Sequence, residues 1–128
     1  MNEMSDEVSP AVDTVREHFV GHAVEVTPDG GGGAYVVVRD VEVGVRYTPV
    51  TTWLGFQINN AYPRSDVYPH YVGVVACTDG RGHGVGVQTV SWRNEPALQL
   101  SRCSNRWNPA YDNAALKAEK VLTWFAGL

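Results

Sequence analysis

Residues 34–47 read AYVVVRDVEVGVRY, and this stretch carries two signals for extended backbone. From Ala34 to Arg39 the side chains are mostly β-branched valines, which favour strands. From Val41 to Tyr47 apolar side chains alternate with charged residues or glycine, and a period of two places all apolar members on one face. The stretch therefore predicts β-structure with one face in a hydrophobic core.

Strand patterns continue on both sides of this stretch without an intervening helix. The glycine run Gly30–Gly33 predicts a reversal of the chain. Two weaker apolar stretches occur later, at Val87–Trp92 and Ala97–Leu100, and a polar break at Asn94–Pro96 separates them. Strands that follow one another directly along the chain pair antiparallel, so we expect a four-stranded antiparallel meander. The stronger strand patterns outside residues 34–47 are Ala23–Thr27, Trp53–Ile58 and His70–Cys77.

Helices are predicted at the two ends of the chain. Ser9-Pro10 is typical of a helix start, and the apolar spacing after it ends near Gly21. Asp112 can cap a last helix with one broad apolar stripe, which Gly127 closes. Because the helices are segregated from the strands, the fold class is α+β. The apolar positions of the two helices are Ala11, Val12, Val15 and Phe19, then Ala115, Leu116, Ala118, Leu122 and Phe125.

Length and composition limit the protein class. A chain of 128 residues predicts one domain, residues 9–128, after a loosely ordered segment, residues 1–8. A net charge of −4 and only ten scattered Lys and Arg argue against a nucleic-acid partner. The acidic start and the lack of a long apolar run predict a cytoplasmic protein without membrane contact, in which Cys77 and Cys103 stay reduced.

Two proline-containing segments are distinctive. Residues 54–63 read LGFQINNAYP, a strand pattern that runs into Tyr62-Pro63, and Trp107-Asn108-Pro109-Ala110 lies ahead of the last helix. With the element order from Ser9 to Leu128, these segments resemble the ubiquitin-conjugating enzyme superfamily, in particular its divergent bacterial branch. In that family an N-terminal helix precedes a four-stranded meander whose third strand enters a Tyr-Pro segment, and a cysteine precedes a Trp-Ser-Pro-Ala-like stretch.

The resemblance implies both a function and partners. Members of this branch accompany ubiquitin-like modifiers, an activating enzyme and a deubiquitinase-like peptidase, so it implies a component of a bacterial conjugation pathway that binds modifier and activating enzyme. It places the activating enzyme on Val12–Phe19 and ligases near Asn60–Asp66. Arg16 and Arg64 are the polar residues expected to be exposed at these two surfaces. No cofactor or metal is implied.

The active-site residues of the family are only partly matched. The family's cysteine lies eight residues before the tryptophan, where this chain has Gln99, and a glutamine amide cannot carry a thioester. The family's His-Pro-Asn triplet is absent as well. A displaced nucleophile is available in Cys103, four residues before Trp107 and flanked by arginines whose charge favours a thiolate. Asn105 and Asn108 could then stabilise the oxyanion.

Three hypotheses about these residues stay open. Cys103 transfers the modifier, or the protein is a catalytically silent adaptor in which the loop only packs Trp107 onto the sheet. The third hypothesis is that the protein is an unrelated small-ligand-binding α+β domain, with an aromatic pocket between sheet and helix. Cys77 is a lesser candidate because burial at a strand end would make its thiol inert. His83, in the glycine-rich loop, is either a base that faces the site or a solvated loop residue, and we expect the second.

Overall fold

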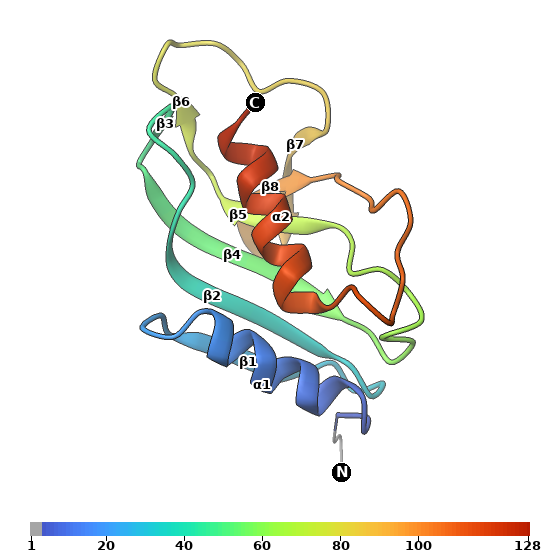
Figure 1. The fold of residues 1–128 in the computed structure, drawn as a ribbon. Coiled ribbons are helices and arrows are strands. Elements are labelled where there is room, and N and C mark those ends of the chain that lie inside the picture. Colours follow the sequence, from blue (N-terminus) through green and yellow to red (C-terminus); the bar gives the residue numbers. More distant parts are fainter. Residues whose placement is uncertain (1–3) are drawn as a thin grey trace.

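The computed structural model of the chain describes residues 4–128, which form two helices and eight strands (Figure 1). The α+β class is confirmed. Both helices lie on the same face of the main sheet, with α1 over its β1–β2 side and α2 across its centre. The elements are α1 (Val8–His18), β1 (Val24–Pro28), β2 (Ala34–Glu42), β3 (Tyr47–Thr48), β4 (Thr51–Ile58), β5 (His70–Gly73), β6 (Ala76–Cys77), β7 (Val87–Trp92), β8 (Glu95–Leu100) and α2 (Ala114–Ala126).

The main sheet has six strands in the order β1-β2-β4-β5-β8-β7, and every neighbouring pair is antiparallel. The antiparallel pairing is confirmed, but the prediction of four strands is wrong. The two additional strands form a hairpin whose two-residue turn, Arg93-Asn94, has positive φ at both positions. Proline is tolerated at position 96 of β8, although it has no N–H to donate. The pairing of β8 with β5 ends at Ala97, so no strand on that side would accept a hydrogen bond from residue 96.

The predicted strand His70–Cys77 is divided between two sheets. Its first half, β5, pairs with β4 and β8, whereas β6 pairs with β3 in a separate two-stranded sheet. The alternating stretch Val41–Tyr47 is also interrupted, because the β2–β4 register shifts next to Asp40, which has φ 59°, and Gly44 has φ 118°. These bends carry the chain out of the main sheet and into the small one.

The helix ends differ from the sequence prediction by a few residues. Helix α1 begins at Val8, before Ser9-Pro10, and its first N–H groups donate to the carbonyl of Ser5. Residues 1–3 of the predicted N-terminal segment lie outside the described residues. Asn113 caps α2, because its Oδ1 accepts from Leu116 N, and Gly127 follows the helix as predicted. Neither helix within residues 4–128 is long and apolar enough to span a membrane.

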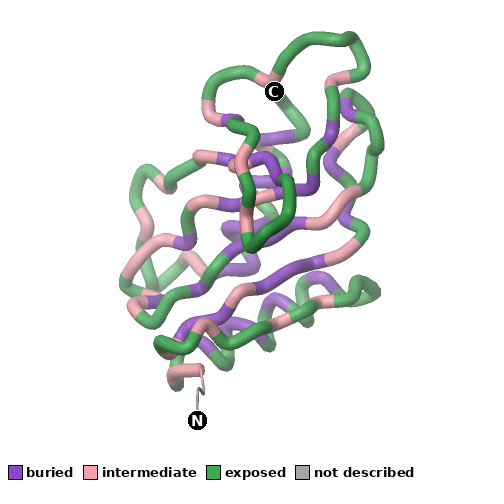
Figure 2. The backbone as a smooth tube through the Cα atoms, turned by 180° about the vertical axis from the view of Figure 1, so that it is seen from behind, coloured by how far each residue is buried: buried purple, intermediate pink, exposed green. Residues whose placement is uncertain are grey.

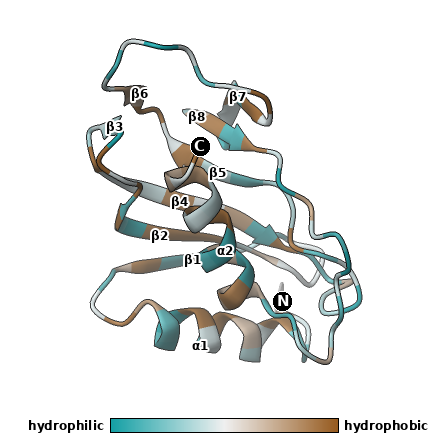
Figure 3. Cartoon of the chain, turned by 45° about the horizontal axis from the view of Figure 1, so that its top comes forward, coloured by the Kyte–Doolittle hydropathy of each residue, from teal (hydrophilic) through white to brown (hydrophobic). Residues whose placement is uncertain are grey.

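The core lies between the helices and the inner face of the sheet. Alternate residues of β4, namely Leu54, Phe56 and Ile58, are fully buried there. Tyr47 joins the small sheet to α2, because its ring stacks on Phe125 at 4.2 Å and its hydroxyl donates to the Phe125 carbonyl over 2.6 Å. Figure 2 shows buried chain along the central strands and exposed chain in the loops, and both helices in Figure 3 carry hydrophobic and hydrophilic sides.

Candidate functional site

The Tyr-Pro segment and the Trp-Asn-Pro-Ala turn lie side by side. Trp107 Nε1 donates to the Pro63 carbonyl over 2.7 Å, and the Tyr62 and Trp107 ring centroids are 6.3 Å apart. The Tyr62 hydroxyl accepts from Ala114 N at the start of α2 over 3.1 Å. Pro109 follows in the exposed turn before that helix. The two segments that carry the family resemblance are therefore joined directly by one hydrogen bond, from Trp107 to Pro63.

A buried ion pair fixes the loop of Cys103 to this assembly. Lys117, with only 3% of its side chain exposed, donates from Nζ to both Asp66 carboxylate oxygens over 2.9 and 2.8 Å and to Ser104 Oγ over 2.9 Å. Ser104 N donates to Asp66 as well, over 2.8 Å. This cluster, called the Lys117 clamp below, ties the Tyr-Pro segment, the loop and α2 together. The sequence shows no spacing that would single out its three members.

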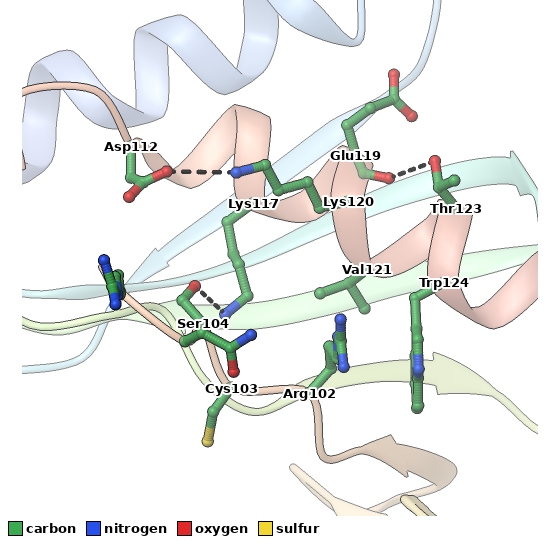
Figure 4. Close-up of a pocket in the computed structure, with 12 residues that line it drawn as sticks. Arg102, Cys103, Ser104, Asp112, Lys117, Glu119, Lys120, Val121, Thr123 and Trp124 are labelled. Atoms are coloured by element: carbon green, nitrogen blue, oxygen red, sulfur yellow. Dashed lines mark hydrogen bonds and ion pairs between the residues drawn. The ribbon is translucent and has the colours of Figure 1, made fainter. Parts of the chain in front are cut away.

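An open groove of about 620 Å³ lies between residues 102–106 and α2 (Figure 4). Cys103 is exposed at this groove, and its sulfur is directed away from α2. Asn105 also lines the groove. Cys103 and one of the two candidate amides, Asn105, therefore border the same groove.

The other side chains near the loop have defined contacts. The Arg102 guanidinium lies over the Trp124 ring, 5.9 Å from its centroid, and Arg106 lines the groove. Asn108 is outside the lining of the groove, and its Oδ1 accepts from Ala110 N within the turn. Within residues 4–128, no side chain is hydrogen-bonded to Cys103, so the described contacts supply it with no general base.

The remaining predicted site residues are spread over the surface. Gln99 lies on the outer, helix-free face of the sheet, opposite Tyr71, and donates to Ser101 Oγ over 3.3 Å. Arg16 is exposed on α1 and donates to the Val24 carbonyl, whereas Arg64 is exposed beside Glu7 at 3.8 Å. Within the implied contact range Val12–Phe19, the residues Val12, Val15 and Phe19 are buried in the core.

A buried histidine lies near the clamp. His70 is fully buried, its ring is 5.1 Å from that of Phe56, and neither ring nitrogen has a hydrogen-bond partner among residues 4–128. Burial, with the positive charge of Lys117, lowers the pKa of His70 to about 3, although Asp66 acts in the opposite direction. His70 is therefore neutral at physiological pH.

The outer face of the sheet carries an aromatic cluster that sequence reasoning missed. Trp92 stacks on Tyr71 at 4.7 Å and on Trp53 at 5.8 Å, and Tyr35 meets it edge-on at 6.3 Å. Arg93 lies over the Tyr35 ring at 4.5 Å. The alternation of Trp53 with the buried residues of β4 was the signal for the outer face, but nothing local showed that the four rings meet.

Comparison of the chain with protein-family models, with curated proteins and with solved structures returned no match.

Proposed function

We propose that the protein is a ubiquitin-conjugating-enzyme-like component of a bacterial modifier pathway, and that it accepts the modifier on Cys103. The observation that carries this proposal is the hydrogen bond from Trp107 to Pro63, which joins the two motifs of the resemblance. Exposure of Cys103 beside the groove is consistent with a thiol that must meet a protein-bound thioester.

The transfer step is a thioester exchange. Sγ of Cys103 attacks the carbonyl carbon that joins the C-terminus of the modifier to a cysteine of the activating enzyme. A new carbon–sulfur bond forms, the old one breaks, and the proton of Cys103 passes to the departing thiolate. We expect the Asn105 amide, which lines the same groove, to stabilise the oxyanion formed on the way.

A silent adaptor is the second candidate, and the surroundings of Cys103 favour it. Arg102 is directed onto Trp124 instead of the thiol, and no base contacts Cys103 in the described part of the chain. The third hypothesis, a small-ligand-binding domain, has less support. Its pocket would lie between sheet and helix, and Leu54 and Phe56 fill that space as fully buried side chains.

Intact-mass spectrometry distinguishes transfer from adaptor function. The chain is incubated with ATP and with the modifier and activating enzyme encoded in the same genome. Transfer predicts a hydroxylamine-sensitive modifier adduct that Cys103→Ala abolishes and the matched variant Cys77→Ala retains. A chain that binds the activating enzyme but stays unmodified is the adaptor. A chain that binds neither protein contradicts both candidates.

A further inference from the structure

Cys77 and His83 contact each other, although the sequence predicts an inert thiol for Cys77 and a solvated loop position for His83. Cys77 lies at the end of β6 and is half-buried rather than enclosed. His83 belongs to the glycine-rich loop that follows, and its Nδ1 is 3.9 Å from the Cys77 sulfur. A thiol and an imidazole in contact are the components of an activated nucleophile.

The second ring nitrogen of His83 determines which atom can act as a base. Nε2 lies 2.7 Å from the Val75 carbonyl oxygen, and a carbonyl only accepts, so Nε2 carries the proton in this contact. In the neutral ring Nδ1 is then unprotonated and directed at Cys77. The chain thus supplies a nucleophile, a base and a backbone group that orients the base.

The surrounding chain holds this pair in place. Thr78 N donates to the Arg46 carbonyl over 2.8 Å, and Gly80 N donates to the Cys77 carbonyl over 3.1 Å. The His83 ring lies 6.0 Å from that of Tyr47 and 6.2 Å from that of Phe125. The contact therefore rests on the small sheet and on the end of α2, and not on the loop alone.

The pair opens into a hollow of about 340 Å³ whose lining includes two arginines, Arg46 and Arg81, and one carboxylate, Asp79. Arg81 is 3.5 Å from the exposed Asp79, whereas Arg46 has no ion-pair partner within residues 4–128. Positive charge next to the thiol attracts a negatively charged reactant. This hollow is separate from the groove of Cys103, because the two share no lining residue.

We propose that Cys77 is a thiol–disulfide exchange site for small anionic disulfides, with His83 as its general base. Sγ of Cys77 attacks one sulfur of the disulfide while its proton passes to Nδ1 of His83. A new sulfur–sulfur bond forms, the original one breaks, and the departing thiolate takes the proton from His83. One disulfide replaces another, so the exchange needs no other oxidant.

The two cysteines of the chain allow an internally controlled test. The intact protein is treated with glutathione disulfide, and mixed disulfides at Cys77 and Cys103 are quantified by peptide mass spectrometry over time. The expected result is faster modification of half-buried Cys77 than of exposed Cys103. His83→Gln, which retains a donor for Val75, should slow Cys77 by about 100-fold, the lower end of general-base catalysis, and leave Cys103 unchanged.

Two further variants complete the test. His22→Gln is the matched control, since His22 also contacts a backbone carbonyl but no cysteine, and it should leave both rates unchanged. Arg46→Gln should slow Cys77 roughly fivefold with glutathione disulfide but not with neutral hydroxyethyl disulfide. An unchanged Cys77 rate in His83→Gln, or slower modification of Cys77 than of Cys103, overturns the proposal. Equal effects of Arg46→Gln on both reagents overturn the anionic preference. Neither readout depends on transfer at Cys103.

Discussion

Lys117 places a positive charge in the interior of the protein, where it is stable only with its partners. The buried Nζ has three acceptor atoms, two on Asp66 and one on Ser104. This arrangement explains how a polar loop stays fixed beside the groove, since an unpaired charge at the same depth would be strongly unfavourable. The position of Cys103 therefore depends on a residue of α2 that carries no chemistry itself.

Replacing Lys117 with Met should lower the free energy of unfolding by about 3 kcal/mol, because Asp66 would lose the partner that compensates its burial. Urea denaturation measures this loss. Lys120→Met is the control, because Lys120 is 69% exposed and meets Asp112 at 3.3 Å, so its loss should cost under about 1 kcal/mol. Equal losses in both variants would contradict a structural role for the clamp.

His70 should make the protein less stable in acid. The pKa of His70 is about 3 in the folded protein and 6.5 in an unfolded chain. Below pH 6.5 the unfolded chain therefore binds a proton on His70 that the folded protein does not. Stability should fall as the pH drops from 6.5 toward 3, by roughly 1.4 kcal/mol per pH unit.

The variant His70→Leu isolates this effect from the carboxylates, which titrate in the same range. Urea denaturation at several pH values should show a shallower acid loss in the variant than in the original protein. His22→Gln, at an exposed position, should follow the original curve. Parallel curves for His70→Leu and the original protein would mean that His70 does not remain neutral in the fold.

Among the elements, β4 and β5 show how glycine shapes the outer face of the sheet. The rings of Trp53 and Trp92 lie where a side chain on Gly55 would project. At Gly73 the same space is filled by the Thr52 hydroxyl and the Trp53 ring. These glycines let the aromatic cluster lie flat on the strands. A strand interior is otherwise an unfavourable place for glycine, so both positions are explained by close packing.

Gly55→Ala should therefore disturb the aromatic cluster. The added methyl group would overlap the Trp92 ring and come 3.0 Å from Trp53 Cζ3, so we expect a loss of about 1–3 kcal/mol and altered tryptophan fluorescence. Gly82→Ala serves as the control, since a methyl group there meets nothing within 4 Å and φ is not positive. An unchanged spectrum for Gly55→Ala would show that the rings are not packed against β4.

For the molecule as a whole, the predicted associations with an activating enzyme and with a ligase can be tested on two exposed arginines. Charge reversal at Arg16 should weaken binding of the activating enzyme, and charge reversal at Arg64 should weaken binding of the ligase, both measured by calorimetry. Neither change should alter the melting temperature much, because both side chains are exposed. Glu42→Lys, on the exposed side of β2, is the control and should leave binding unchanged. Unfolding of the arginine variants would contradict the assignment of these residues to the surface.

Local periodicity was sufficient for the α+β class, the antiparallel pairing and most strand positions. Apolar residues spaced by two, or by three to four, indicate directly which side chains face the core, as at Leu54, Phe56 and Ile58. The number of strands in the main sheet could not be predicted from periodicity in the same way. Hairpin β7–β8 depends on positive φ at Arg93 and Asn94. Asn94 is a residue type that tolerates this conformation, but Arg93 gives no such signal.

The site depended on contacts between distant parts of the chain. Lys117 and Asp66 are separated by 51 residues and Trp107 and Pro63 by 44, so no local pattern could pair them. Cys77 and His83 are close in sequence, yet their contact requires β6 to pair with β3 and the loop to fold back onto Val75. Periodicity reports the face on which a residue lies, whereas the partner it meets there is set by how the sheet, the loops and α2 pack together.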